Sequence, residues 1–144
     1  MKRAFIFFLP FMVMLGAGCM KHNDSDGNTF PVPSGSFAGK FTRLHYNTTK
    51  KGYDTLSANI VLTMDVKTGY KVTGDTSTVH AGSFGDFSMN AYAIQFADKT
   101  YTSTPPPSKI HLYGIYEYGY DGTNLQIDAT FADTLGFFYD LKRQ

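Results

Sequence analysis

The sequence predicts an all-β fold, an antiparallel meander of about eight strands that closes into a barrel. From residue 35 onward apolar and polar residues alternate, as in strands with one buried face, and short turn-forming stretches separate the alternating runs. No run of ten or more residues has the 3.6-residue period of a helix. An open meander exposes two edges that can aggregate, so closure is favoured over the alternatives, a β-sandwich or an open sheet.

The expected strands follow from these alternating runs and span residues 36–46, 55–66, 70–77, 82–88, 89–97, 109–120, 123–132 and 135–143. The second strand has the clearest alternation. Its inward positions are all apolar: Leu56, Ala58, Ile60, Leu62, Met64 and Val66. On the first strand one face carries Phe37, Gly39, Phe41, Arg43 and His45, and on the fifth strand Tyr92, Ile94 and Phe96 share a face. On the last strand the apolar face expected to meet the core is Phe137, Tyr139 and Leu141. If the sheet closes, the first and last strands are neighbours.

Turn residues support the same division into strands. Asp121-Gly122 is the strongest hairpin signal in the chain, and Lys67-Thr68-Gly69 is a second. The three prolines at 105–107 lack N–H donors, so the segment 102–108 is expected to be a loop. Glycines within the strands permit the sharp coiling that a small barrel needs. They are Gly39, Gly74, Gly85 and Gly114.

The N-terminal segment has the order of features found in an export signal. Met1-Lys2-Arg3 is a basic start, residues 4–15 are apolar, and Gly16-Ala17-Gly18 supplies small residues for cleavage. As a helix, residues 4–15 would be about 18 Å long, shorter than the roughly 30 Å hydrocarbon core of a bilayer. Residues 1–18 are therefore expected to be a removable signal peptide and not a membrane span.

Cys19, the only cysteine, directly follows these small residues. This arrangement resembles the lipobox of bacterial lipoproteins, although Leu15 lies one place further from the cysteine than in that motif. The resemblance implies that Cys19 is acylated and anchors the protein to the outer membrane, with the domain facing the periplasm or the cell surface. An ordinary secretory signal followed by an unmodified cysteine is the alternative. Residues 19–34 are polar and rich in Gly, Ser, Asn and Pro, which predicts a flexible tether.

The composition after the signal peptide fits one domain, residues 35–144, with no affinity for polyanions. The whole chain has 13 basic and 12 acidic residues. Loss of Lys2 and Arg3 leaves 11 basic residues and a net charge of −1. Nucleic acid is therefore not expected as a partner. The chain contains 13 Phe and 10 Tyr but no Trp, enough aromatic residues to fill a β core.

The stretch "GSFAGKF" at the start of the first strand resembles the Gly-x-Trp motif that opens lipocalin-type barrels, with Phe37 in place of Trp. The resemblance implies a lipocalin-like barrel in which Gly35 and Phe37 close one end. It implies no ligand-binding residue. Barrels of eight strands are either filled by side chains or hold one small ligand.

Catalytic and metal-binding signatures are weak. His45, His80 and His111 have no paired spacing, so they are expected at the surface or at the edge of the core, and no metal or cofactor is expected. The sequence has no nucleophile elbow, phosphate loop or dinucleotide fingerprint. The carboxylates are expected on solvated strand faces or beside turns. They are Asp75, Asp86, Asp98, Asp128, Asp133 and Asp140. The protein is therefore not expected to be an enzyme, and a hydrolase is the least favoured function.

The tyrosine-rich stretch at 112–122 is the best candidate for a binding surface. Tyr113 lies on one face of the expected strand, and Tyr116, Tyr118 and Tyr120 on the other. Either face could line a cavity or meet a partner, and packing on both faces of a strand is the competing interpretation. Two functions follow. The protein is a lipid-anchored envelope module that binds a small apolar ligand or a protein partner, or it is an accessory subunit with a packed barrel.

Overall fold

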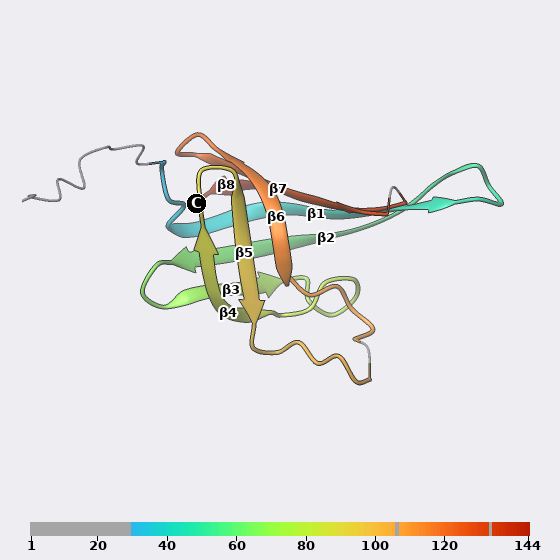
Figure 1. The fold of residues 1–144 in the computed structure, drawn as a ribbon, viewed down its shortest axis with the longest axis horizontal. Helices are drawn as coiled ribbons and strands as arrows, with labels where there is room; N and C mark the ends of the chain where they lie inside the picture. The colour runs from blue at the N-terminus through green and yellow to red at the C-terminus, as the bar shows by residue number, and fades with distance from the viewer. Residues whose placement is uncertain (1–29, 106, 133) are drawn as a thin grey trace, which may run out of the picture.

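The structure is a computed structural model that describes residues 30–105, 107–132 and 134–144, and it contains one closed barrel (Figure 1). Each strand pairs antiparallel with the next along the chain. The strands are β1 (Gly35–Asn47), β2 (Gly52–Asp65), β3 (Gly69–Gly74), β4 (Phe84–Met89), β5 (Ala93–Asp98), β6 (Gly114–Tyr120), β7 (Asn124–Phe131) and β8 (Leu135–Arg143). The predicted all-β meander is confirmed, and neither a sandwich nor an open sheet forms.

Pairing of β1 with β8 closes the barrel. The register runs from Phe37 opposite Arg143 to His45 opposite Leu135. Gly39 makes this close approach possible, because a Cβ atom there would collide with the backbone carbonyl oxygen of Asp140. The first and last strands are therefore neighbours, as the sequence predicts.

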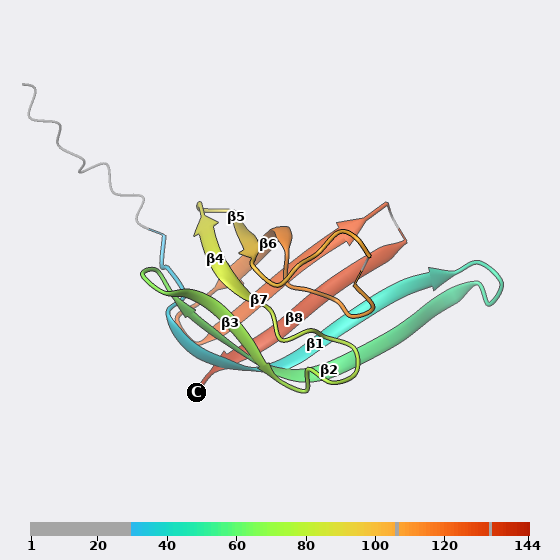
Figure 2. The same cartoon turned by 90° about the horizontal axis from the view of Figure 1, so that it is seen from below.

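Strands β1 and β2 are longer than the barrel wall and extend beyond it as a hairpin (Figures 1 and 2). The prediction that Leu56 faces the core is wrong, since it lies in this extension and its exposed fraction is 46%. Val66 and Tyr92 are also exposed, at 68% and 82%, because each lies in a turn outside the strand to which the alternation assigned it. Alternation alone does not reveal where a strand leaves the barrel.

The lumen is filled by side chains from all around the wall. Aromatic rings pack against one another inside it: Phe41 lies 4.8 Å from Tyr139 on the neighbouring strand, and Phe96 lies 4.9 Å from Tyr70, between ring centroids. The largest fully buried side chains are Tyr116, Tyr139, Phe37, Phe41, Phe96, Ile60, Leu62, Met64, Ile94, Leu112, Leu125 and Ile127. Burial of this many large apolar groups is the main stabilising contribution to such a barrel.

The two ends of the barrel differ in their connections. One end, which we call the short-turn end, has the turns 66–68, 90–92 and 121–123, and β1 begins there. At the turn 121–123 the Asp121 carboxylate accepts the N–H groups of Thr123 and Asn124, so the predicted hairpin is present. The opposite end, which we call the loop end, has the long connections 75–83 and 99–113.

The long connection 99–113 corrects the predicted sixth strand, which begins at Gly114 and not at Lys109. Ile110 instead forms a bridge to His80 in the other long connection, and Leu112 is fully buried. These residues are apolar because they cover the end of the barrel, which produces an alternation similar to that of a strand. Among the residues described, no helix is long and apolar enough to cross a membrane.

Candidate functional site

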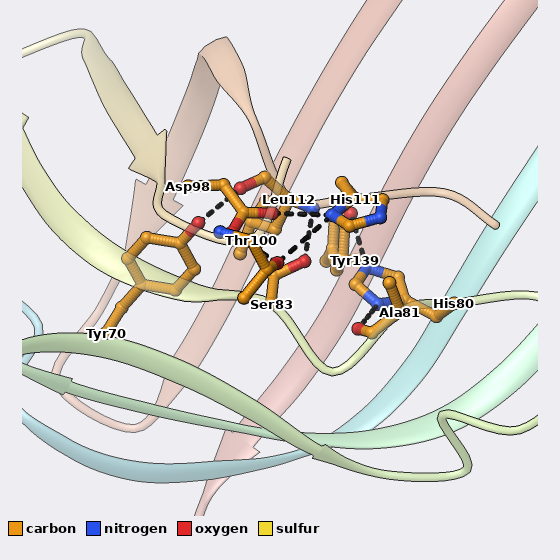
Figure 3. A network of polar contacts seen from close by, with 9 residues as sticks. All are labelled: Tyr70, His80, Ala81, Ser83, Asp98, Thr100, His111, Leu112 and Tyr139. Carbon is orange, nitrogen blue, oxygen red and sulfur yellow. Dashed lines mark hydrogen bonds and ion pairs between the residues drawn. The ribbon is translucent and has the colours of Figure 1, made fainter. Parts of the chain in front are cut away.

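Four polar side chains converge at the loop end, around the carboxylate of Asp98 (Figure 3). Asp98 is the last residue of β5, and its side chain is fully buried. Its Oδ2 lies 2.7 Å from Nδ1 of His111, and its Oδ1 accepts the Thr100 hydroxyl at 2.6 Å and the Thr100 N–H at 2.7 Å. The Ser83 hydroxyl is also hydrogen-bonded to this carboxylate. One carboxylate therefore joins β5 to both long connections.

Burial acts against the charge of Asp98, but its hydrogen bonds outweigh burial. Desolvation raises the pKa of the carboxyl, whereas the hydrogen bonds from Thr100, His111 and Ser83 lower it, and the resulting pKa is below the usual value for aspartate. Asp98 is therefore ionised at neutral pH. An ionised, buried carboxylate with several donors is costly to disturb, because each donor would lose its acceptor.

The same cluster also holds the backbone of the connection 99–113 at Leu112. The N–H of Leu112 donates to Ser83 Oγ at 3.1 Å, and the Tyr70 hydroxyl donates to the Leu112 carbonyl at 2.5 Å. Both backbone groups of Leu112 thus find partners beneath the loop, while its side chain enters the core. Buried backbone groups need such partners, so Ser83 and Tyr70 allow the loop to close the barrel without a ladder.

His80 is a second buried polar group at this end, and it has no solvent exposure. Its Nδ1 lies 2.6 Å from the Ala81 carbonyl and must donate, so Nε2 accepts the Tyr139 hydroxyl at 3.0 Å. Burial lowers the pKa of His80 from 6.5 to about 4, so the ring is neutral at neutral pH. Phe41 packs edge-on against the ring, at 4.8 Å between centroids.

An aromatic pair lies outside this polar cluster. The rings of Tyr101 and Tyr113 stack at 4.4 Å with 5° between their planes, and Tyr101 also contacts His111. Both tyrosines are partly exposed, at 37% and 49%. The aromatic pair therefore forms an exposed surface on the loop that covers the barrel.

The cluster has the composition of a catalytic triad but not its arrangement. In such a triad the carboxylate contacts one imidazole nitrogen and the serine hydroxyl contacts the other nitrogen of the same ring. Here the hydroxyl of Ser83 is bonded to Asp98 and to a backbone N–H, and Ser83 is fully buried. Within the described ranges, no group of three His, Cys, Asp or Glu residues is arranged to hold a metal ion. The geometry is that of a structural latch for the two long connections.

Two expectations about polar residues are corrected by this cluster. Asp98 does not lie on a solvated face, and His80 lies inside the core and not at its edge. Among the other candidates, Asp128 is half-buried, Asp133 lies outside the described residues, and the remaining ones are exposed: His45, Asp75, Asp86 and Asp140. The sequence Asp98-Lys99-Thr100 is a local signal that could have identified the latch, since aspartate often accepts the N–H two residues further on.

At the opposite, short-turn end, Phe37 lies near the start of β1 and is fully buried. Its ring packs edge-on against Tyr120 at 5.8 Å, and the guanidinium of Arg143 lies 5.1 Å from the ring centroid. Arg143 also donates to the Gly122 carbonyl at 3.1 Å and to the Tyr120 hydroxyl at 2.5 Å. Gly35 has a φ of 111°, and the Arg143 side chain approaches it closely. Arg143 was not identified from the sequence, because it is distant from Phe37 along the chain.

The four candidate tyrosines do not form one surface. Tyr116 is in the core, and its burial raises its pKa to about 12. Tyr118 donates its hydroxyl to the Asn90 carbonyl, and Tyr120 belongs to the short-turn end. Only Tyr113 has an exposed ring, in the aromatic pair described above. Cys19, with the rest of residues 1–29, lies outside the described residues.

Comparisons of the chain with models of protein families, with curated proteins and with solved structures found no match.

Proposed function

We propose that this protein is a lipid-anchored module of the bacterial cell envelope that binds a protein partner through the outside of a solid barrel and catalyses no reaction. Acylated Cys19 anchors the chain to the outer membrane, and residues 20–34 serve as the tether. The domain itself is a rigid body that presents its surface to other envelope components. Of the two functions that the sequence predicts, this is the second, in which the barrel is packed and the protein acts through its outer surface.

The filled lumen is the observation that carries the proposal. Barrels that bind small apolar ligands need an empty, mostly apolar cavity. Here that space is taken by Phe41, Tyr116, Tyr139 and other large side chains, and both long connections cover the loop end. Hollows of about 490 and 360 Å³ occur instead on the wall, one beside Lys71 and Phe84 and one between β6 and β7. A partner on the outside of the barrel fits this distribution of space.

The direction of the chain supports the same function. Residues 30–34 lead into β1 at the short-turn end, where the tether would hold the barrel near the membrane (Figure 2). The loop end, with the exposed pair Tyr101 and Tyr113, would then point away from the bilayer. Exposed tyrosines offer both apolar contact and hydroxyl groups, and they are common at interfaces.

A lipocalin-like relationship is part of this proposal. The support for it is that Gly35 and Phe37 lie at the start of a closed eight-stranded meander and that Arg143 covers the Phe37 ring. In this interpretation the protein keeps the closed end of such a barrel and has lost the ligand cavity. The closed end then serves stability, and the binding function moves to the outer surface.

Two experiments test the proposal. Replacement Cys19→Ser should move the protein from the membrane fraction to the soluble fraction, whereas Ser34→Ala in the tether should leave it in membranes. Native mass spectrometry of the wild-type protein in detergent should give the mass of the processed chain plus its acyl groups. A Cys19→Ser protein that stays in the membrane would contradict the anchor, and a co-purifying small molecule would contradict the solid barrel.

A further inference from the structure

Strands β6 and β7 pair along only part of their length. Their ladder ends at the pair Glu117–Asp128. Beyond it, in the described part of the chain, residues 114–116 of β6 pair only with β5, and residues 129–131 of β7 pair only with β8. The two strands lie side by side near their turn and diverge toward the loop end (Figures 1 and 2). Each therefore has one edge without a partner strand.

The space between these edges is a hollow of about 360 Å³, which we call the notch. It is lined by residues 115–117 of β6 and 128–131 of β7. Ile115 and Phe131 are exposed at its sides, at 64% and 42%. Unpaired strand edges flanked by exposed apolar side chains are the features that let a sheet accept another strand. Three unpaired residues on each side correspond to a segment of about 10 Å.

The notch is also acidic at its closed end. Glu117 and Asp128 are directly opposite each other in the ladder, on the outer face. Like charges in this arrangement are unfavourable unless a cation lies between them. Among the described residues, neither carboxylate has a lysine, arginine or histidine within ion-pair distance. The pair therefore provides an uncompensated negative charge next to two free backbone edges.

We propose that the notch binds an extended segment of a partner protein, which adds as a strand beside β6 or β7 and places a lysine or arginine next to Glu117 and Asp128. Backbone hydrogen bonds to the free edges would provide affinity, and the acidic pair would select for basic residues. This inference rests on the proposed function and specifies the class of partner that the module recognises.

The alternation of the two strands also predicts the pattern of the segment. Ile115, Glu117, Asp128 and Thr130 point outward, whereas Tyr116 and Ala129 point inward. A strand added between them has outward residues beside the carboxylates and inward residues above the small side chain of Ala129. The expected segment therefore alternates basic residues with apolar residues of moderate size, such as valine.

A second copy of this chain is less well matched to the notch. The β1–β2 hairpin leaves one edge of β2 unpaired at residues 52–59, since β2 pairs with β3 only from Ile60 onward. This stretch, GYDTLSAN, contains no lysine or arginine and carries Asp54. Asp54 is already ion-paired with Lys50 at 2.7 Å, so this edge brings no basic side chain of its own to Glu117 and Asp128, which favours a different, basic partner.

The test uses a capped hexapeptide of alternating lysine and valine, titrated into the full chain in detergent and followed by NMR. The amide signals of residues 114–116 and 129–131 should shift. Glu117→Lys should weaken binding about fivefold or more, because it replaces attraction by repulsion. The same substitution should leave the melting temperature equal or higher, since it removes the repulsion with Asp128. Asp86→Lys makes the same change in charge on β4 and should bind as the wild type does.

A second peptide, N-methylated at alternate backbone nitrogens, separates strand addition from simple charge attraction. It keeps the charge but loses backbone donors, so its binding should be at least about fivefold weaker. Equal binding of both peptides, or no shift at either edge at millimolar peptide, would overturn the proposal. Self-association of the protein in sedimentation that Glu117→Lys abolishes would also overturn it in favour of a second copy. Each of these failures would leave the membrane and mass tests of the proposed function unaffected.

Discussion

The two ends of the barrel are closed by different kinds of interaction. At the short-turn end an aromatic ring, Phe37, lies between Tyr120 and the guanidinium of Arg143. At the loop end a buried carboxylate, Asp98, accepts hydrogen bonds from three side chains, and a neutral His80 lies beside it in the core. Apolar contact is nearly independent of pH, whereas the polar closure depends on two protonation states. The comparison therefore predicts that acid opens the barrel at its loop end first.

The difference has a structural cause. The short-turn end is closed by strands whose backbone groups are already paired, so side chains only need to fill space. The loop end is covered by two connections that lack a ladder, and their buried backbone groups need specific partners. Ser83 and Tyr70 supply these partners, and Asp98 orients the loops. Polar closure is therefore the consequence of covering a barrel with loops.

The largest effect is expected from removing the ring at the short-turn end. Phe37→Ala deletes a fully buried aromatic side chain and leaves a cavity under Arg143, which should lower the free energy of unfolding by about 3–5 kcal/mol. Phe138→Ala is the matched control, since Phe138 points outward on β8 and should cost far less. Denaturant unfolding of both variants measures the difference. Equal losses would show that Phe37 does not close the barrel.

The next effect concerns pH and the loop end. His80 has a pKa of about 4 in the folded state and 6.5 when unfolded. The unfolded chain therefore binds a proton more readily, so the contribution of His80 is fully present above pH 6.5 and is lost as the pH falls toward 4. The loss amounts to roughly 3 kcal/mol. Asp98, whose pKa is lowered, loses its own contribution only below the ordinary aspartate range.

Unfolding measured between pH 7 and 4 tests this assignment. The variant His80→Gln, which cannot titrate, should remove most of the slope between pH 6.5 and 4, although it is less stable at pH 7. His45→Gln, the same substitution at an exposed position on β1, is the matched control. A wild-type slope that persists in His80→Gln would assign acid sensitivity to another group.

Sequence reasoning succeeded where the signal is local and failed where contacts are distant. The alternation in residues 58–64 and the turn at Asp121-Gly122 follow from local spacing. The pairing of the first and last strands follows from the need to leave no strand edge exposed. The latch could not be predicted in full, because Asp98 ends β5 whereas Ser83 and His111 lie in two different connections, and only the contact of Asp98 with Thr100 has a local signal. The prediction of strand over residues 109–113 is wrong, because residues that cover the end of a barrel also alternate between apolar and polar.

A moderate effect is expected from neutralising the latch. Asp98→Asn keeps the size of the side chain but turns an acceptor into a donor that faces Thr100 or His111, so the free energy of unfolding should fall by about 2 kcal/mol. Asp86→Asn is the control, because its ion pair with Lys99 is exposed and contributes little. Hydrogen exchange should rise in the connections 75–83 and 99–113 before it rises in β1 and β8. Uniform acceleration over the whole barrel would show that the latch does not act locally.

The smallest effect isolates the guanidinium at the short-turn end. Arg143→Lys keeps the positive charge, but a lysine cannot reach the Gly122 carbonyl and the Tyr120 hydroxyl together while also covering the Phe37 ring. The loss should be about 1 kcal/mol, or roughly 4 °C in melting temperature for a domain of this size. Lys142→Arg, the reverse substitution at the exposed neighbouring position, should leave the melting temperature unchanged. The contact of the guanidinium with the Phe37 ring and its two hydrogen bonds are short-range, so the deficit of Arg143→Lys should persist in high salt. A deficit that disappears with salt would make Arg143 a simple charge and leave Phe37 and Tyr120 to close that end alone.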